Sequence, residues 1–217
     1  GPGDSLFSMV YSRRYTNEKF YFIDVDNFAS RNLKLYFKLH KKLEQEKFHI
    51  KHLKKPFRDF DNLLSFYNAE YLTSGIDSLR KIDDNSVDYI FSHSVIEHIR
   101  KYELDDLIYE MYRVLKPKGV ISHNINYKDH LDESLNNLRF SEELWESNLF
   151  ACSGFYTNRI PAVEMHKNFK KYGFNLVEED FGRWDKMPIS RSVLAKEFRR
   201  FTNDELARPT SRFIAIK

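Results

Sequence analysis

Two glycines and an aspartate near the N-terminus have the spacing of a nucleoside-binding site. Gly1 and Gly3 lie in a predicted tight turn, and Asp24 follows an apolar run about 20 residues later. Glycines at such a turn let a ligand approach the backbone, and the helix that follows offers free N–H groups. A carboxylate at this distance can accept hydrogen bonds from both ribose hydroxyls. The alternative is that Gly1-Pro2 is a remnant of a cleaved tag and that Asp24 only caps the next helix.

A second group of polar side chains follows the strand predicted over residues 120–124. It is the run His123, Asn124, Asn126, Tyr127, Asp129 and His130. Ligands of parallel sheets bind beyond the carboxyl ends of the strands, and histidine is the commonest general base. We therefore predict that His130, and after it His123, takes a proton from a substrate. The alternative is that His123 is packed at the strand end and that His130 caps a loop.

The segment that follows, residues 126–160, is rich in aromatic, amide and arginine side chains. Such groups bind small molecules by stacking and by bidentate hydrogen bonds. The predicted substrate-binding residues are Tyr127, Arg139, Trp145, Tyr156 and Arg159. The alternative is that Trp145 belongs to the core and that the two arginines are solvated or paired.

The elements that must position these residues alternate along the chain. Short apolar runs predict strands at 20–23, 69–73, 87–92, 120–124, 174–177 and 212–216. Helical spacing predicts helices from about residue 5, from about residue 27, and over 103–115, 161–172 and 188–201. This alternation predicts an α/β fold, a parallel sheet with helices on both of its faces.

Composition limits the class of protein. The chain has 217 residues and a formal net charge of +3, which gives no strong electrostatic attraction to nucleic acid or to an anionic membrane. Its apolar runs are too short to cross a bilayer, and it starts with no signal-peptide pattern. The single cysteine, Cys152, excludes an internal disulfide and a zinc site built from cysteines. We expect one cytoplasmic domain over residues 1–217.

Two motifs in the middle of the chain carry a family resemblance. Residues 86–98 read S-V-D-Y-I-F-S-H-S-V-I-E-H, and residues 113–120 read R-V-L-K-P-K-G-V. In this order and spacing they resemble the fourth and fifth strands of class I S-adenosylmethionine (SAM)-dependent methyltransferases of the small-molecule type. The resemblance spans nearly the whole chain. It implies a Rossmann-like sheet, SAM as the cofactor, and methyl transfer to a small acceptor such as a saccharide or a phosphorylated metabolite.

The resemblance also implies roles for individual residues. Gly1 and Gly3 would pass close to the methionine part of SAM, and Asp24 would hold the ribose hydroxyls. Residues near the adenine would be Gly75, Ile76 and Asp77, and those near the sulfonium would be Ser92 and His93. Residues 126–160 would form a lid over the acceptor.

The chain departs from the family pattern at its start. The glycine turn at residues 1–4 should follow a first strand, and that strand is absent from the sequence. Removal of a central strand from a parallel sheet exposes the edges of its neighbours. We expect the family's sheet with its first strand missing.

A second departure concerns a metal. Some quinone-pathway methyltransferases resemble this chain at Glu97-His98 and bind a divalent cation there through two glutamates and a histidine. The position of the first glutamate is Ser94 in this chain. We therefore predict no metal, with Glu97 and His98 as a hydrogen-bonded pair that supports the pocket.

Two other functions are compatible with the glycine turn and Asp24. One is a nicotinamide-dependent oxidoreductase, although the chain has no Tyr-x-x-x-Lys pair of the kind that supplies the acid in hydride transfer. The other is a non-catalytic nucleotide-binding protein that keeps the fold without the activity.

Overall fold

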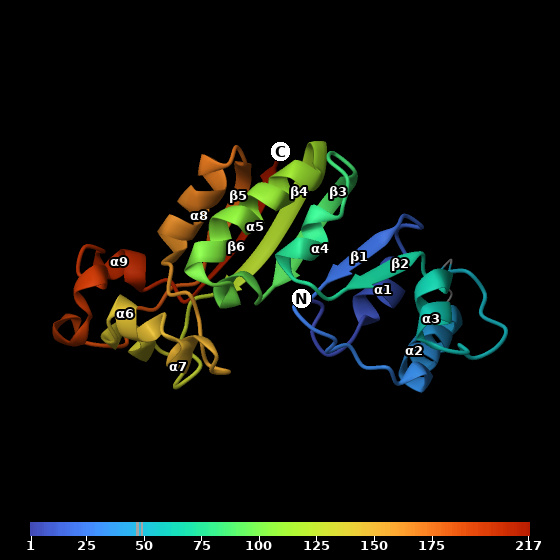
Figure 1. Cartoon of the computed structure of the whole chain (residues 1–217), viewed down its shortest axis with the longest axis horizontal. Coiled ribbons are helices and arrows are strands. Elements are labelled where there is room, and N and C mark those ends of the chain that lie inside the picture. The colour runs from blue at the N-terminus through green and yellow to red at the C-terminus, as the bar shows by residue number, and fades with distance from the viewer. Residues whose placement is uncertain (47, 49) are drawn as a thin grey trace. The chain divides into compact units, whose positions relative to one another are not determined.

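The computed structural model describes residues 1–46, 48 and 50–217. These residues form two compact units, residues 1–81 and residues 82–217, and each is described by itself. Residues 1–19 contain a turn and one helix but no strand. The strands that follow form one sheet of two strands and one sheet of four (Figure 1).

The unit of residues 1–81 is a parallel strand pair with short helices. In chain order its elements are α1 (Phe7–Ser12), β1 (Phe20–Ile23), α2 (Leu33–Gln45), α3 (Phe60–Phe66), β2 (Ala69–Leu72) and α4 (Ile76–Arg80). β1 pairs with β2 in register from Phe20 opposite Ala69 to Ile23 opposite Leu72. Both strands therefore end at the same edge, where Asp24 follows β1. The predicted strands at 20–23 and 69–73 are confirmed, whereas the helix expected from about residue 27 begins at Leu33.

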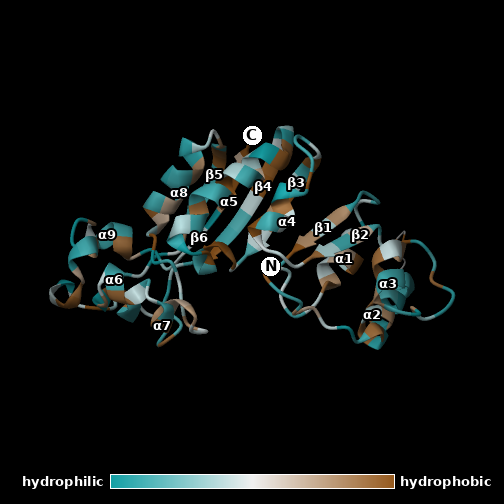
Figure 2. Cartoon of the chain, in the orientation of Figure 1, coloured by the Kyte–Doolittle hydropathy of each residue, from teal (hydrophilic) through white to brown (hydrophobic). Residues whose placement is uncertain are grey.

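The core of this unit is formed by apolar side chains of its strands and helices. β1 is a mostly hydrophobic run (Figure 2), and α2 turns one apolar side inward. The buried side chains include Leu6, Met9, Tyr36, Leu43 and Leu63. Burial of such side chains is the main stabilising term for a unit of this size. The loop of residues 24–32, between β1 and α2, lies outside the regular elements and is held by side-chain hydrogen bonds described below.

The unit of residues 82–217 is built on the four-stranded sheet. Its strands are β3 (Val87–His93), β4 (Leu115–Asn126), β5 (Asn175–Phe181) and β6 (Thr210–Ile216), in the spatial order β3-β4-β6-β5. Its longer helices are α5 (Lys101–Val114) and α8 (Ala162–Lys171). Its shorter elements are η1 (Ile96–His98), η2 (Asn136–Arg139), α6 (Glu142–Trp145), α7 (Asn148–Ala151), η3 (Arg191–Val193), η4 (Lys196–Phe198) and α9 (Asn203–Leu206).

The topology brings three strand ends to one edge. β3 is parallel to β4, and β6 is antiparallel to both β4 and β5. The carboxyl ends of β3, β4 and β5 therefore point the same way. The last strand, β6, is antiparallel to its neighbours, whereas the sequence predicted a parallel sheet. α5 and α8 contact each other beside the sheet (Figure 1). We call the edge at these three strand ends the catalytic edge.

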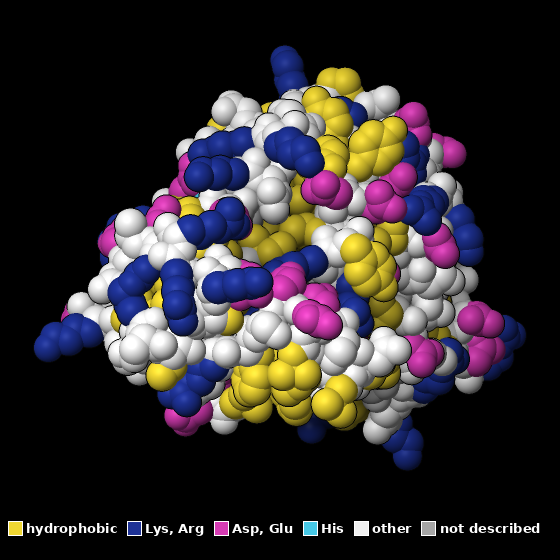
Figure 3. Space-filling model, turned by 60° about the vertical axis from the view of Figure 1, so that its left-hand side comes forward, with side chains coloured by type: hydrophobic (Ala, Val, Ile, Leu, Met, Phe, Trp, Pro, Cys, Tyr) yellow, Lys and Arg dark blue, Asp and Glu magenta, His cyan; other side chains and the backbone are white. Residues whose placement is uncertain are grey.

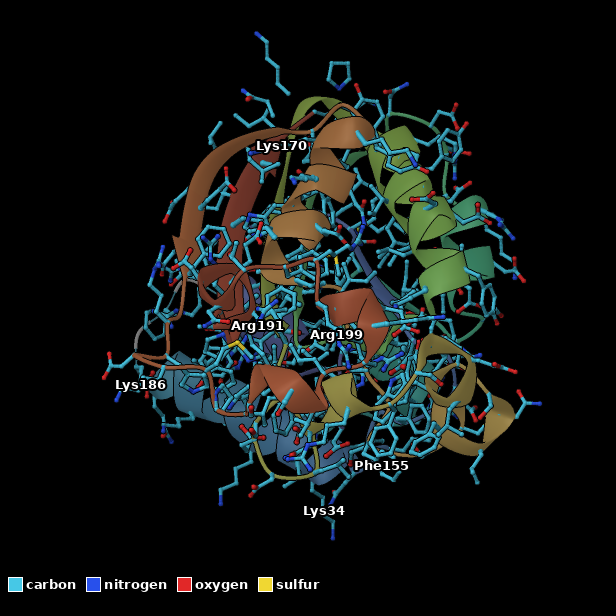
Figure 4. All side chains as sticks on the ribbon, turned by 90° about the vertical axis from the view of Figure 1, so that its left-hand side faces the viewer. Lys34, Phe155, Lys170, Lys186, Arg191 and Arg199 are labelled. Atoms are coloured by element: carbon cyan, nitrogen blue, oxygen red, sulfur yellow. The ribbon has the colours of Figure 1, made fainter. Side chains whose placement is uncertain are left out.

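The predicted helix over residues 188–201 is wrong. That stretch forms two 3₁₀ turns, η3 and η4. Backbone carbonyls there bond to arginine side chains instead of to a helix ladder: Arg191 donates to the carbonyls of Phe201 and Arg199, and the Arg199 Nε atom donates to the carbonyl of Leu194. Figure 4 labels Arg191 and Arg199 on this segment between β5 and β6.

The segment 183–208 packs on the predicted lid and shares a core with it. The members of this lid cluster are Leu135, Leu138, Ile189, Leu194, Phe198, Phe201 and Leu206. A backbone bond from Ala195 N to the Leu138 carbonyl joins the two parts. The region beyond the catalytic edge therefore consists of two segments that are distant in sequence, of which the sequence predicted only residues 126–160.

Three arginines of the segment 183–208 form ion pairs with acidic side chains. Lys and Arg side chains are numerous on the face in Figure 3 and have Asp and Glu side chains among them. Arg183 and Arg208 bond to the two oxygens of Asp204 at 2.5 and 2.8 Å, and Arg200 bonds to Glu164 at 2.8 Å. Such exposed pairs contribute little to stability, and they reduce the positive field of this segment.

Candidate functional site

In residues 1–81, the glycine turn lies against Asp24. A Cβ atom added to Gly1 would stand 2.9 Å from the Asp24 Oδ1 atom, so a side chain there would displace the carboxylate. Gly3 has a φ of +72°, a backbone conformation that glycine adopts without strain. The backbone N–H of Ser30 donates to the carbonyl of Asp4 at 2.9 Å and joins the turn to the loop after β1. The predicted cofactor residues Gly1, Gly3 and Asp24 are thus brought together.

The backbone around Asp24 is fixed on both sides. Asp24 donates its N–H to the Leu72 carbonyl at 2.9 Å and accepts the N–H of Gly75 at 2.8 Å. Its side chain is 9% exposed, and Oδ1 accepts the N–H of Val25 at 2.9 Å. A carboxylate oxygen has lone pairs for more than one hydrogen bond, so both oxygens can still accept from a ligand. This set of residues fits a nucleoside with ribose hydroxyls.

The predicted adenine residues begin the short helix α4. Gly75 has a φ of +55° and caps the helix, next to Asp24 through the bond above. Ile76 is partly buried, whereas the Asp77 carboxylate is exposed and bonded to Arg80 at 2.8 Å. Gly75 therefore bonds directly to Asp24, Ile76 is the next residue in the chain, and Asp77 bonds to Arg80 of its own helix.

In residues 82–217, His123 lies in the core. It is 1% exposed, and its ring lies 5.4 Å from the ring of Phe169 on α8 and 5.5 Å from that of Phe213 on β6. Its Nδ1 atom is 2.7 Å from the Ser92 hydroxyl, and burial lowers the pKa of the imidazole to about 3. The structure thus places His123 among packed core side chains rather than at an exposed strand end, and its role as a base stays a prediction. Ser92 bonds into the same core, whereas His93 is exposed at the end of β3.

His123 makes the stability of this unit sensitive to acid. Its folded pKa lies below the ordinary value of 6.5, so its contribution is fully present above pH 6.5 and is lost as the pH falls toward 3. We expect His123→Leu to remove part of the acid destabilisation of the protein. Urea unfolding at pH 7 and at pH 4.5 measures it: the difference between the two pH values should be a few kcal/mol smaller in the variant. An equal pH dependence in the two proteins contradicts this assignment.

Two exposed histidines stack on each other at the catalytic edge. The rings of His98 in η1 and His130 after β4 are 5.1 Å apart and inclined by 12°. The His98 Nδ1 atom lies 3.0 Å from the carbonyl oxygen of Tyr156, which can only accept, so Nδ1 carries a proton. In neutral His98 the lone pair is therefore on Nε2. Partial burial, with the charge of His98, lowers the pKa of His130.

The turn that carries His98 is bonded to residues 156–158 at three further points. The Asn158 side chain donates to the carbonyls of Ile96 and Ile99 at 2.8 and 3.1 Å, and its N–H donates to the carbonyl of Glu97 at 2.7 Å. The Glu97 carboxyl is buried and accepts the N–H of Asn126 at 3.1 Å. Burial raises the pKa of Glu97. The buried Glu97 side chain thus supports the turn by its hydrogen bond to the end of β4. Among the described residues, no hydrogen bond joins the side chains of Glu97 and His98.

His130 stands on a loop ordered by Asp129. The buried Asp129 carboxylate accepts the N–H groups of Leu131 at 2.9 Å and Asp132 at 2.7 Å, and it also accepts the N–H of Asn136. This is the pattern by which Asp organises turns through its own side chain. The sequence K-D-H-L-D contains that signal, whereas nothing local in the sequence indicates the bonds from Asn158 to η1.

Four of the five predicted substrate-binding side chains lie in the interior. Trp145 is fully buried and donates from Nε1 to the Thr157 carbonyl at 2.7 Å. The hydroxyl of Tyr156 bonds to both oxygens of Glu146 at 3.0 Å, and that of Tyr127 lies 2.7 Å from the Ser211 hydroxyl. The structure thus places these side chains in the interior, where each already has a hydrogen-bond partner, and their role in substrate binding stays a prediction.

Arg159 is the fourth interior side chain. Its guanidinium lies 5.1 Å from the ring centres of both Trp145 and Phe198. It donates to the carbonyls of Asn137 and Phe140 at 3.0 and 2.7 Å, and to Glu142 at 2.9 Å. Its two terminal nitrogens are thus bonded inside the lid, whereas its buried Nε atom has no hydrogen-bond partner among the described residues. Among the five, only Arg139 is exposed.

Comparisons with known proteins agree with this arrangement. A family model for a methyltransferase domain matches residues 1–122. The chain belongs to this methyltransferase family. Its activity is methyl transfer and its cofactor is SAM. No curated protein matches the chain.

Two solved structures share the fold at low sequence identity. A SAM-dependent methyltransferase from Methanosarcina mazei is 12% identical, with a TM-score of 0.53 over 100% of this chain and 89% of that one. A structure described as a SAM-dependent methyltransferase from Listeria monocytogenes is 14% identical, with a TM-score of 0.50 over 97% of this chain and 85% of that one. The mixed α/β methyltransferase fold is therefore confirmed.

Two further features of the described residues bear on membranes and on metals. Over residues 1–46, 48 and 50–217, no helix is long and apolar enough to cross a membrane. Within the same described residues, no group of three or more His, Cys, Asp or Glu side chains could hold a metal ion.

Proposed function

We propose that this methyltransferase methylates a hydroxyl group of a small-molecule acceptor, of which a saccharide is the favoured class, and that residues 1–217 act as one domain. The observation that carries the proposal is the His98 imidazole, whose Nε2 lone pair is fixed at the catalytic edge by the bond from Nδ1 to Tyr156. A hydroxyl acceptor needs a base, whereas an amine already has a lone pair.

Two cations of the lid are already bonded to other groups, which favours a neutral acceptor over a phosphorylated one. Phosphate is bound in proteins by arginine forks and by lysine ammonium groups. The guanidinium of Arg159 is instead bonded to two carbonyls and to Glu142. Lys128, near His130 in sequence, is paired with Glu133. Arg139 is the exposed cation of the predicted set and remains a candidate acceptor contact.

The unit of residues 1–81 would hold the nucleoside part of SAM. Asp24 would accept hydrogen bonds from the ribose hydroxyls, with Gly1 and Gly3 at the turn and with Gly75, Ile76 and Asp77 near the adenine. His93 at the end of β3 is the exposed member of the pair predicted near the sulfonium. SAM, when bound, supplies an electrophilic methyl group.

The stacked histidines would supply the base. His98 Nε2 takes the proton of the acceptor hydroxyl as the oxygen forms a bond to the methyl carbon and the carbon–sulfur bond breaks, with its electron pair left on sulfur. S-adenosylhomocysteine and the methyl ether are the products, and the proton remains on His98. His130 would cover one face of that ring and keep its orientation.

A product assay tests this proposal. The protein is incubated with SAM and pools of neutral saccharides, phosphorylated sugars and amines, and S-adenosylhomocysteine is measured by mass spectrometry. We expect release with a neutral saccharide pool and none from Asp24→Ala under the same conditions. Release with amines alone, or only with phosphorylated sugars, contradicts the proposed acceptor class.

A further inference from the structure

The hydroxyl of Tyr71 lies at the centre of the loop that follows β1. Tyr71 is on β2, opposite Phe22 of β1, and its ring packs edge-on against Phe60 with ring centres 6.3 Å apart. From there the side chain reaches the loop of residues 24–29. Its Oη atom accepts the N–H groups of Phe28 at 3.0 Å and Ala29 at 3.2 Å.

The same hydroxyl has two acceptors for its one hydrogen. The carbonyl of Asp26 is 3.0 Å away and the Oδ2 atom of Asp24 is 3.4 Å away. A tyrosine hydroxyl donates once and accepts twice, so Tyr71 uses its full capacity on this loop. No helix or strand orders residues 24–29. Tyr71 therefore bonds to four groups of this loop, in addition to backbone bonds such as that from the Phe28 N–H to the Asp26 carbonyl at 3.1 Å.

The other end of the loop is held separately. The Tyr36 hydroxyl, on α2, accepts the N–H of Leu6 at 3.1 Å and donates to the Ser30 carbonyl at 2.8 Å. Tyr36 thus holds the loop where it meets α1 and α2, whereas Tyr71 holds it at the carboxylate. The two tyrosines provide a matched comparison, because each loses one hydroxyl on replacement by Phe.

We propose that Tyr71 is a positioning residue for the ribose hydroxyls of the cofactor. It fixes the loop on which Asp24 stands and limits rotation of the carboxylate through Oδ2, so that both oxygens face a vicinal diol. The inference rests on the proposed role of Asp24 in holding the ribose. It adds that recognition of the two hydroxyls depends on a residue that does not itself contact them.

Binding of two nucleosides tests the inference without an acceptor. Adenosine carries both hydroxyls and 2′,3′-dideoxyadenosine carries neither, and their dissociation constants are measured by ligand-observed NMR on the whole chain. We expect Tyr71→Phe to weaken adenosine binding about tenfold and to change dideoxyadenosine binding less than about twofold. Tyr36→Phe should lower stability to urea and leave the ratio of the two constants as in the wild type.

Each other outcome is decisive. If Tyr71→Phe weakens both nucleosides equally, or neither, the positioning role is overturned. If Tyr36→Phe changes the ratio as much as Tyr71→Phe does, the effect is general loosening of the loop and the inference fails. If Asp24→Ala leaves the ratio unchanged, or if the wild type binds no adenosine, the proposed ribose site itself is wrong.

Discussion

Replacement of Arg159 by Ala is expected to lower the free energy of unfolding by about 3–5 kcal/mol. The Arg159 side chain lies between the rings of Trp145 and Phe198 and bonds to two backbone carbonyls and Glu142. Its removal leaves both carbonyls without this donor and opens a cavity beneath the lid cluster. Arg159→Lys should recover little of the loss, because an ammonium cannot reproduce the forked geometry.

Arg139→Ala is the matched control, since Arg139 is exposed in the same region. We expect it to change the free energy of unfolding by less than about 0.5 kcal/mol. Urea unfolding followed by tryptophan fluorescence makes the comparison, because Trp145 lies next to Arg159. Equal stability of the Arg159 and Arg139 variants would mean that the lid does not depend on the buried guanidinium.

Replacement of His98 by Asn is expected to lower kcat about 10²- to 10⁴-fold with the acceptor found by the product assay. The Asn amide can still donate to the Tyr156 carbonyl, as Nδ1 of His98 does, but it has no basic nitrogen. The turn should therefore stay in place while the base is lost.

His130→Phe separates the base from its stacking partner. Phe keeps an aromatic ring against His98, so we expect a loss of less than about tenfold. Circular dichroism and SAM affinity should be unchanged in both variants. A His98→Asn rate within tenfold of the wild type, or a larger loss in His130→Phe, assigns the base to another group.

Features set by local sequence were predicted well. The apolar run Phe20–Ile23 forms β1, and Asp24 stands at its end beside the glycine turn, because a buried strand and a turn have strong local signals. The helix predicted over 161–172 is α8, with proline before it and Gly173 after it.

Features set by packing between segments that are far apart in the sequence were not predicted. Trp145 and Arg159 have the composition of a binding surface, yet both are buried. Trp145 packs among aromatic rings of residues 140–156, and Arg159 packs beside Trp145 and Phe198; no local pattern indicates these contacts. Residues 188–201 form two 3₁₀ turns rather than the predicted helix, and arginines of this stretch bond to its own carbonyls. The proton position on His98 is likewise set by a carbonyl 58 residues away in the chain.

Calorimetric titration of SAM into the protein tests the central claim most directly. Asp24→Ala removes the carboxylate beside Gly1, while Asp26→Ala removes a neighbouring exposed carboxylate and serves as the control. We expect the wild type and Asp26→Ala to bind SAM alike, and Asp24→Ala to bind at least about tenfold more weakly, as loss of charge-assisted hydrogen bonds requires. Absence of binding at millimolar SAM, or equal affinity in wild type and Asp24→Ala, would contradict a SAM site built on this aspartate.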